Sequence, residues 1–211
     1  PKKFNYKIEI IKPLVAKNFY KKSETNYINK NFCFLIVGGS QGAKIFDDLI
    51  KDTIIDLSKK YLISVIQQTS LQNFEYLKRV YDENNIKNKI FNFEKNFINL
   101  LEDSDLCITR SGATSLAEIA IMNKPFVAIP LPTSKDNHQM ENAKFYEKAG
   151  CCWILDQKNT DIDKEKLANI LSNILKDKTE YIKKKQNLKK LNYQNSWNDV
   201  NQKIKEIINE N

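Results

Sequence analysis

Residues 32–44 of the chain read FCFLIVGGSQGAK, and this stretch decides the fold class. A continuous apolar run without polar alternation is typical of a parallel strand that is buried on both faces. The run ends in a glycine-rich turn, and apolar residues then recur at helical spacing between residues 45 and 57. Strand, glycine turn and helix together predict the first unit of an α/β sheet.

The same unit of strand and helix recurs along the chain. Further strands are predicted at residues 61–66, 90–93, 106–109, 126–129 and 151–155. Helices are predicted at residues 43–60, 71–84, 97–101, 113–122 and 137–148. This alternation predicts a doubly wound, Rossmann-like parallel sheet. Extra C-terminal helices, rich in lysine and asparagine, are predicted at residues 163–175, 179–191 and 197–208.

Composition and length fit a globular domain. The chain has 211 residues, of which 41% are hydrophobic and 28% are charged. No apolar run approaches the roughly 18 residues of a membrane-spanning helix, and residues 1–5 show no signal-peptide core. The four cysteines lack C-x-x-C spacing and His138 is the one histidine, so we expect buried, reduced thiols and no His-rich zinc site.

Positive charge is concentrated at the two ends of the chain. Residues 1–30 carry eight lysines against two glutamates, and residues 161–211 carry 11 lysines against eight acidic residues. These ends fit either an anionic membrane surface or a solvated lysine-rich surface. A nucleic-acid binder is disfavoured, because the middle of the chain is nearly neutral and Arg79 and Arg110 are the only arginines.

Glycine is scarce, and three of the five glycines, Gly38, Gly39 and Gly42, lie in the first turn. Such a turn lets backbone N–H groups and the N-terminus of the following helix approach an anion. Ser40 adds a hydroxyl donor. The turn lacks the Gly-Lys-Ser/Thr ending of a Walker loop, and it is not G-x-G-x-x-G. A turn required only by packing is the alternative.

Two later turns carry further polar groups. Residues 109–118 read TRSGATSLAE and place Glu118 about one turn into a helix, where a carboxylate can accept ribose hydroxyls. The alternatives are a glutamate favoured by the helix dipole and a capping role for Ser111 or Thr114. Residues 130–143 read PLPTSKDNHQMENA, and groups suited to sugar hydroxyls gather there: Asp136, Asn137, His138, Gln139 and Asn142. His138 fits a capping or surface histidine equally well.

The three turns, in this order and spacing, resemble the donor-binding half of the MurG family. These enzymes are the N-acetylglucosaminyltransferases that act on undecaprenyl-pyrophosphoryl-muramoyl-pentapeptide in peptidoglycan synthesis. The similarity covers residues 31–156, and Gly150 follows the third turn as in the family. It implies one half of a GT-B fold and inverting transfer from UDP-GlcNAc, with neither a metal ion nor another cofactor required. It also implies a peripheral protein at the cytoplasmic face of the bacterial inner membrane, serving cell-wall biogenesis, cell shape and cell division.

The resemblance also implies a donor site. Ser40 and the backbone of Gly39, Gln41 and Gly42 would hold the diphosphate, and Glu118 would bind the ribose. Gln139, a better match than His138, would contact the GlcNAc hydroxyls. The uracil would meet the backbone at Phe93 and Glu94. The remaining implied donor-binding residues are Arg110, Ser111, Gly112, Ala113 and Asn142.

The chain departs from the family pattern in two short stretches. Residues 11–15 read IKPLV and lack the arginine of the family's Gly-Asn-Pro-Val-Arg stretch, for which Lys17 is a point-charge substitute. Gln67, Gln68 and Thr69 stand where the family has a His-Gln segment. Both departures affect the phosphate side of the expected site.

Residues 1–30 are interpreted as a remnant of an N-terminal half and a linker, and residues 31–160 as the UDP-sugar-binding domain. Residues 161–211 are interpreted as a helical segment that packs back toward the missing half. The catalytic base is expected in that half, so no base is named. The chain is expected to bind donor and not to turn over alone.

Two other functions stay open. The chain fits a UDP-sugar transferase that acts on another lipid acceptor, such as diacylglycerol, and a non-catalytic donor-binding subunit with a separate membrane-bound partner. If the family resemblance holds, the lysines of residues 1–30 and 183–185 are expected to help hold the protein near anionic lipid.

Overall fold

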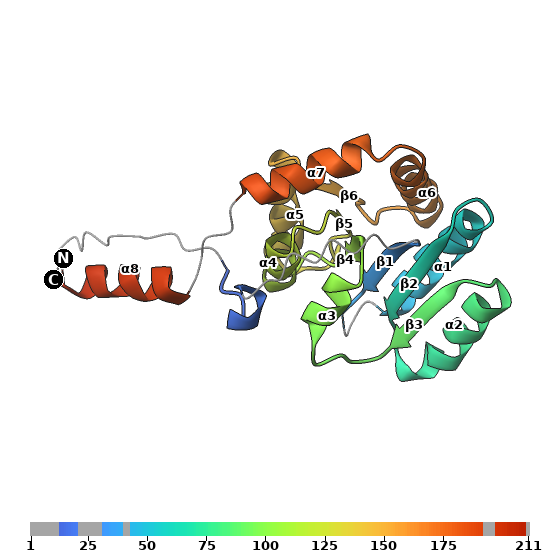
Figure 1. The fold of residues 1–211 in the computed structure, drawn as a ribbon, viewed down its shortest axis with the longest axis horizontal. Coiled ribbons are helices and arrows are strands. Elements are labelled where there is room, and N and C mark those ends of the chain that lie inside the picture. Colours follow the sequence, from blue (N-terminus) through green and yellow to red (C-terminus); the bar gives the residue numbers. More distant parts are fainter. Residues whose placement is uncertain (1–12, 21–30, 40–42, 192–196, 210–211) are drawn as a thin grey trace.

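Six parallel strands form the centre of the computed structural model, which describes residues 13–20, 31–39, 43–191 and 197–209 (Figure 1). The strands are β1 (Phe32–Val37), β2 (Ile63–Gln68), β3 (Lys87–Phe91), β4 (Leu106–Thr109), β5 (Phe126–Ala128) and β6 (Cys152–Ile154). Their order in the sheet is β3-β2-β1-β4-β5-β6. Leu35 of β1 is in register with Ile66 of β2 on one side and Cys107 of β4 on the other. The predicted doubly wound parallel sheet is therefore confirmed.

The direction of winding reverses between β1 and β4. From β1 the chain moves outward to β2 and β3, and it then returns to place β4 on the other side of β1. At such a reversal the connections after the two central strands leave on opposite faces, which opens a crevice at their carboxyl ends. The strand order therefore predicts the crevice after Val37 and Thr109.

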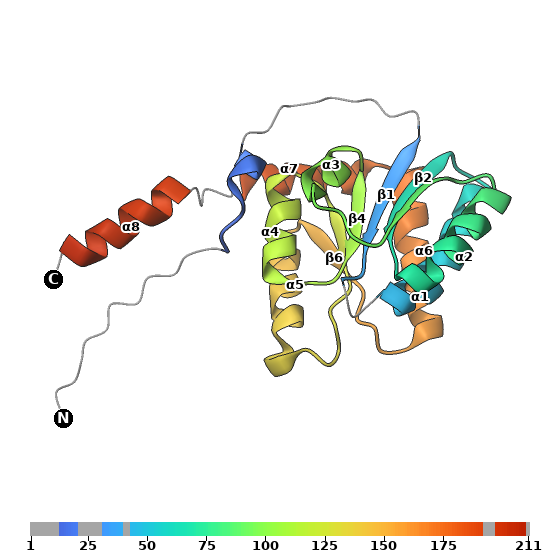
Figure 2. The ribbon, with the colours of Figure 1, turned by 90° about the horizontal axis from the view of Figure 1, so that it is seen from below.

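Helices cover both faces of the sheet (Figure 2). One face carries α1 (Ala43–Ser58), α2 (Leu71–Glu83) and α6 (Thr160–Lys176). The other face carries α3 (Phe97–Glu102), α4 (Ala113–Ile121), α5 (His138–Lys148) and the short 3-10 helix η1 (Lys17–Tyr20). Another short 3-10 helix, η2 (Lys135–Asn137), leads directly into α5.

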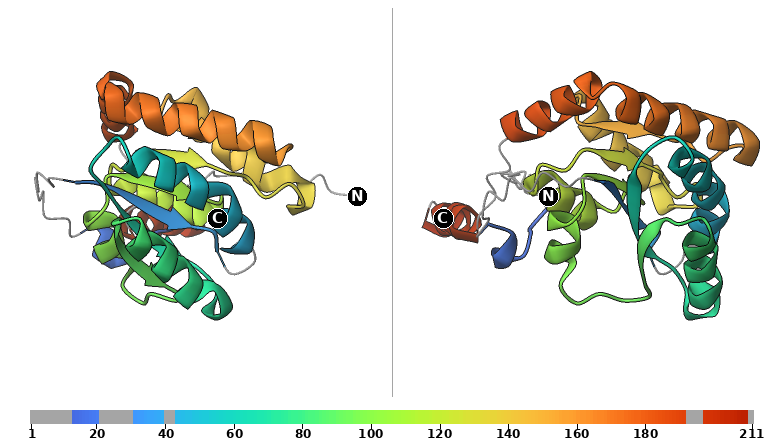
Figure 3. Two further views of the ribbon diagram at one scale, coloured as in Figure 1. Left: turned by 90° about the vertical axis from the view of Figure 1, so that its right-hand side faces the viewer. Right: turned by 45° about the vertical axis from the view of Figure 1, so that its right-hand side comes forward.

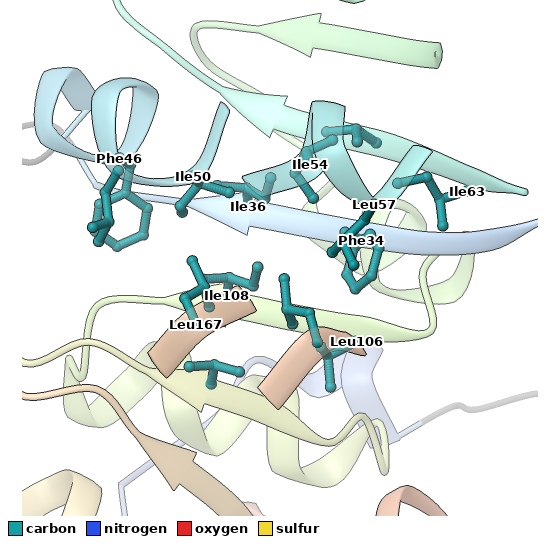
Figure 4. Close-up of a cluster of buried hydrophobic side chains, with 14 of the residues drawn as sticks. Phe34, Ile36, Phe46, Ile50, Ile54, Leu57, Ile63, Leu106, Ile108 and Leu167 are labelled. Carbon is teal, nitrogen blue, oxygen red and sulfur yellow. The ribbon is translucent and has the colours of Figure 1, made fainter. Parts of the chain in front are cut away.

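The two faces have separate cores because alternate residues of a strand point to opposite sides. Phe34 and Ile36 of β1 pack with Phe46 of α1 and Leu167 of α6 (Figure 4). Leu35 of β1 packs in the other core, with residues of α3, α4 and α5. Burial on both faces is the physical reason for the uninterrupted apolar run at residues 32–37.

The C-terminal helices differ in their relation to the sheet. α7 (Thr179–Lys190) follows α6 along one side of the molecule (Figure 3) and crosses the amino ends of β4 and β6. There the Tyr181 hydroxyl donates to the Asp105 carbonyl, and Lys184 donates to the Cys152 carbonyl. α8 (Trp197–Asn209) stands apart from the sheet in Figures 1 and 2. The predicted contact of residues 161–211 with an N-terminal half stays a prediction.

Every predicted strand and helix is present, with shifts at some ends. The second strand begins at Ile63 and not at residue 61, because the chain bends at Tyr61 and Leu62 is still 69% exposed. The third strand begins earlier than predicted, because Lys87 and Lys89 of this edge strand face solvent and interrupt the apolar run. All four cysteines are free and buried, as expected. No helix in the described ranges is long and apolar enough to cross a bilayer.

Replacing Leu171 by alanine tests whether α6 belongs to the folded unit. Leu171 is fully buried in the core against β1 and α1, so Leu171→Ala should lower the free energy of unfolding by about 2–5 kcal/mol. Leu71→Ala is the matched control, because that side chain is 76% exposed, and it should cost less than about 0.5 kcal/mol. Urea unfolding measures both values, and equal losses would contradict the prediction.

Candidate functional site

The candidate site lies at the carboxyl edge of the sheet, where the predicted turns meet. The turns after β1 and β4 lead into the N-termini of α1 and α4, which flank the crevice. The two sides are in contact, since the guanidinium carbon of Arg110 lies 4.8 Å from the centre of the Phe46 ring. Ser40, Gln41 and Gly42 lie outside the described residues. The structure therefore places the flanks of the first turn and the whole of the second.

Gly39 opens the first turn with a φ of +68°, in the left-handed region that glycine adopts without strain. Its backbone N–H donates to Oε1 of Gln68 at 3.1 Å. The same side-chain amide donates through Nε2 to the carbonyl of Asn92 at 3.1 Å. The Gly39 N–H is thus used inside the protein, and the position of the turn depends on Gln68.

Gln139 and Asn142 hold the second turn. Oε1 of Gln139 accepts from the backbone N–H of Ser111 at 3.2 Å and of Leu131 at 3.0 Å, and Nδ2 of Asn142 donates to the Ser111 carbonyl at 2.9 Å. These bonds bring the third polar turn of the sequence against the second, and the expected contact of Gln139 with a sugar stays a prediction. The Nε2 group of Gln139 has no acceptor among the described residues, so its two N–H donors remain for a ligand.

Ser111 is buried, and its hydroxyl has no hydrogen-bond partner among the described residues. α4 has Gly112 at its N-cap position, without a side-chain cap. The alternative that Ser111 or Thr114 caps this helix is therefore wrong. The N-terminal N–H groups of an uncapped helix are available to an anion. Gly112 and Ala113 form this uncapped start.

Arg110 is a buried cation without a carboxylate partner among the described residues. Its side chain is 9% exposed, and Nη1 donates to the carbonyls of Ile129 and Pro130 and to Oε1 of Gln157 at 2.5 Å. Nε has no partner, and burial lowers the pKa of the guanidinium. A buried charge of this kind makes the crevice electropositive.

Glu118 is half-buried in α4, beyond the uncapped turn. Burial raises the pKa of its carboxyl above the ordinary value of 4.5, and no hydrogen bond to this carboxylate is found among the described residues. Its oxygens are therefore partly removed from water and free to accept from ligand hydroxyls.

The residues expected to contact the uracil, Phe93 and Glu94, lie on the loop after β3. Phe93 is 81% exposed, and Glu94 accepts from the backbone N–H of Asn96 and lies 3.7 Å from Lys89. Although β3 is two strands from β1, Gln68 links this loop to Gly39 through Asn92.

His138 is exposed at the start of α5. Nδ1 lies 2.6 Å from the Lys135 carbonyl, and the preceding Asp136 and Asn137 both have left-handed backbone, with φ of 50° and 54°. Gln139, and not His138, contacts the second turn. His138 matches the surface reading that the sequence left open.

Sequence reasoning missed three residues that organise this edge: Asp47, Gln68 and Gln157. Asp47 is 3% exposed, and it accepts from Gln67 Nε2 at 2.9 Å, Thr69 Oγ1 at 2.6 Å and Asn73 Nδ2 at 2.9 Å. The sequence feature that could have identified Asp47 is its spacing. It lies three and seven positions before Ile50 and Ile54, on the helix face that these core residues bury. Polar residues that end a buried strand were the signal for Gln67, Gln68 and Thr69, which we read only as a departure from a family pattern.

No group of three or more His, Cys, Asp or Glu side chains suited to a metal ion is found among the described residues. The absence of a metal requirement stays a prediction. The positive groups that the described residues offer at the site are the Arg110 guanidinium and the helix N-termini.

Comparison with known proteins identifies relatives. Residues 33–203 match the model of the glycosyltransferase family 28 C-terminal domain. Over all 211 residues the chain is 51% identical to a UDP-N-acetylglucosamine--N-acetylmuramyl-(pentapeptide) pyrophosphoryl-undecaprenol N-acetylglucosamine transferase of Pelagibacter ubique, and it spans 59% of that protein. A transferase of the same name from Rickettsia bellii is 38% identical over 66% of this chain and 40% of its own.

A solved structure agrees with these relatives. The crystal structure of Acinetobacter baumannii MurG matches 73% of this chain and 44% of its own, with 25% identity and a TM-score of 0.59. The chain therefore spans only part of the length of the proteins that it resembles.

Asp47→Ala tests the buried carboxylate. It leaves the Gln67 amide and the Thr69 hydroxyl buried without an acceptor, so the free energy of unfolding at neutral pH should fall by about 2 kcal/mol or more. Asp48→Ala, at the exposed neighbour, is the matched control and should cost less than about 0.5 kcal/mol.

The same pair tests the charge of Asp47. Burial raises the pKa of its carboxyl above 3.8, so the wild type should lose stability as pH rises through that pKa. Asp47→Ala lacks this titrating group. The difference in the free energy of unfolding between the wild type and Asp47→Ala should therefore become smaller from acid to neutral pH. Urea unfolding across this range measures this difference, and a difference that widens would contradict the assignment.

Proposed function

The chain belongs to the glycosyltransferase family 28 C-terminal domain family, and we propose that it is the donor-binding part of an inverting hexosyltransferase. The proposed reaction moves GlcNAc from UDP-GlcNAc to undecaprenyl-pyrophosphoryl-MurNAc-pentapeptide in peptidoglycan synthesis. The named relative that is 51% identical over the whole chain supports this activity. The chain spans 59% of that relative. We therefore propose that the acceptor-binding site and the catalytic base lie in the other part of such a protein.

The observation that carries the proposal is the arrangement of the second turn, residues 110–113, at the start of α4. Ser111 is held by Gln139 and Asn142 from the opposite helix, and it leads into an uncapped helix N-terminus beside the buried Arg110. A departing diphosphate gathers negative charge, and fixed N–H groups with a nearby guanidinium stabilise that charge without reorganisation. We propose that these groups take the role that a metal ion plays in other transferases, and that no cofactor is required.

Roles for the remaining residues follow from their positions. The turn that begins at Gly39 binds the diphosphate from the β1 side, with Ser40, Gln41 and Gly42 assigned by family resemblance alone. The partly desolvated carboxylate of Glu118 accepts the ribose hydroxyls. The unpaired Nε2 of Gln139 donates to a GlcNAc hydroxyl, while the loop at Phe93 and Glu94 meets the uracil.

We further propose a peripheral association with the cytoplasmic face of the bacterial inner membrane. The exposed side of α7 carries Ile182 among the lysines at positions 183, 185, 189 and 190, and none of these four lysines pairs with a carboxylate among the described residues. A face of one charge with an apolar centre suits anionic lipid headgroups. α7 covers the amino end of the sheet, so this contact leaves the donor crevice open.

Calorimetric titration with UDP-GlcNAc tests the donor site. Glu118→Gln should weaken binding at least about tenfold, because it exchanges a charged acceptor of two hydroxyls for a neutral amide. Glu165→Gln, exposed on α6, is the matched control and should bind as the wild type does. UDP-glucose should bind more weakly than UDP-GlcNAc, and no binding of any uridine nucleotide would overturn the proposed function.

The pH dependence of this binding has a defined sign. The ionised Glu118 is a stronger acceptor of two hydroxyls than the protonated acid, and burial raises its pKa above 4.5. The affinity of the wild type should therefore fall as pH is lowered through that pKa, while that of Glu118→Gln should change less. Equal pH profiles for the two proteins would contradict the role of Glu118.

Vesicle sedimentation tests the membrane contact. Changing Lys183, Lys185 and Lys189 together to glutamate should lower binding to phosphatidylglycerol-containing vesicles about tenfold or more, since each lysine contributes on the order of 1 kcal/mol. The control reverses Lys95, Lys158 and Lys166, which are exposed and lie outside α7; Lys95 and Lys158 follow the carboxyl ends of β3 and β6, at the opposite edge of the sheet. Equal losses in the two variants would point to net charge alone and would contradict a docking role for α7.

A further inference from the structure

We propose that Gln68 is a positioning residue that couples the base side of the donor site to its diphosphate side. The inference rests on the proposed function and adds a residue that neither the family resemblance nor the comparisons assign. Gln68 ends β2, the strand between β1 and β3, and its side chain is half-buried. It therefore lies between the turn at Gly39 and the loop at Phe93.

A single side-chain amide makes both connections. Oε1 of Gln68 accepts from Gly39 N–H at 3.1 Å, and Nε2 donates to the Asn92 carbonyl at 3.1 Å. Because both hydrogen bonds are made by one rigid, planar amide, a movement of either loop is passed to the other. Asn92, the residue before Phe93, also donates through Nδ2 to the Thr69 carbonyl at 2.9 Å, which fixes the far side of the link.

The residues on either side of Gln68 hold the helix that follows the first turn. Gln67 and Thr69 both donate to the buried Asp47 carboxylate of α1. The Tyr81 hydroxyl of α2 donates to Oε1 of Gln67 at 2.6 Å, and the Asn73 amide completes the shell of Asp47. The end of β2 is thus bonded to both sides of the first turn. Gln68 bonds to Gly39 at its start, and Gln67 and Thr69 bond to Asp47 in the helix that follows it.

This arrangement has a consequence for the ligand. A nucleoside that packs against the loop at Phe93 restrains Asn92, and through Gln68 it restrains the left-handed Gly39, which sets the direction of the turn toward the diphosphate. Binding of the base then lowers the cost of ordering the diphosphate contacts. The two parts of a uridine diphosphate should therefore bind cooperatively through this side chain.

The test compares uridine with UDP for the wild type, Gln68→Ala and Gln72→Ala, by calorimetry on the whole 211-residue chain. Gln72→Ala makes the same change at an exposed position of α2 next to this region. The measured quantity is the ratio of the uridine dissociation constant to the UDP dissociation constant, which reports the gain from the diphosphate. In Gln68→Ala this ratio should fall about fivefold or more, and in Gln72→Ala it should stay within about twofold of the wild type.

Gln68→Glu refines the test. A glutamate keeps an acceptor for Gly39 N–H but places an oxygen against the Asn92 carbonyl, so the link to the base side is lost while the grip on Gly39 is kept. Because the new negative charge would itself repel a diphosphate, this variant is compared by hydrogen exchange and not by the ratio of dissociation constants. Amide hydrogen exchange gives a readout without ligand, since Gly39 should exchange faster in Gln68→Ala and stay protected in Gln68→Glu.

The outcomes separate this inference from the proposed function. If the wild type binds UDP and the diphosphate gain of Gln68→Ala is unchanged, or uridine and UDP lose affinity equally, Gln68 does not couple the two sides. If the wild type binds no uridine nucleotide, the proposed function fails and the inference fails with it. An unfolding midpoint close to that of the wild type shows that Gln68→Ala still folds.

Discussion

Hydrogen bonding of the loops at the carboxyl edge of the sheet is the constraint on which this site depends. Parallel strands end there together, and the backbone that leaves them has no ladder partner. Side-chain amides meet this need: Gln68 joins the loops after β1 and β3, and Gln139 joins the loops after β4 and β5. Gln157, after β6, reaches Arg110 after β4. The crevice between β1 and β4 is thus walled by loops that fix one another.

Two buried charges of opposite sign flank this crevice, and each is stabilised by polar groups other than an ion-pair partner. Asp47 accepts three side-chain hydrogen bonds, and the Arg110 guanidinium donates to two carbonyls and one amide. Both oxygens of Asp47 accept hydrogen bonds from neighbouring side chains, so its charge serves the structure around α1 and β2. Arg110 keeps an unpartnered Nε and an excess of positive charge, so it suits an anionic ligand. The two charges thus differ in how completely their hydrogen-bonding atoms are paired. The paired one supports the structure, and the incompletely paired one is available to a ligand.

Sequence reasoning located the elements well because hydrophobic period is a local property. The runs at residues 32–37 and 106–109 became β1 and β4 with the predicted bounds. It was less accurate at β3, where Lys87 and Lys89 of an edge strand broke the period, and at α4, where Ser111 was read as a possible cap and Gly112 holds the cap position. Such details depend on neighbours that lie far away along the chain.

The sequence by itself determined the winding of the chain, the three polar turns and their family, because buried runs, scarce glycines and ordered motifs can be read locally. Only the tertiary structure decided what each polar side chain does. Gln139, 28 residues from Ser111, and Gln68, 29 residues from Gly39, meet their partners through the strand order. A side-chain hydrogen bond depends on distances of about 3 Å, and no spacing along the chain specifies those distances until the sheet has formed.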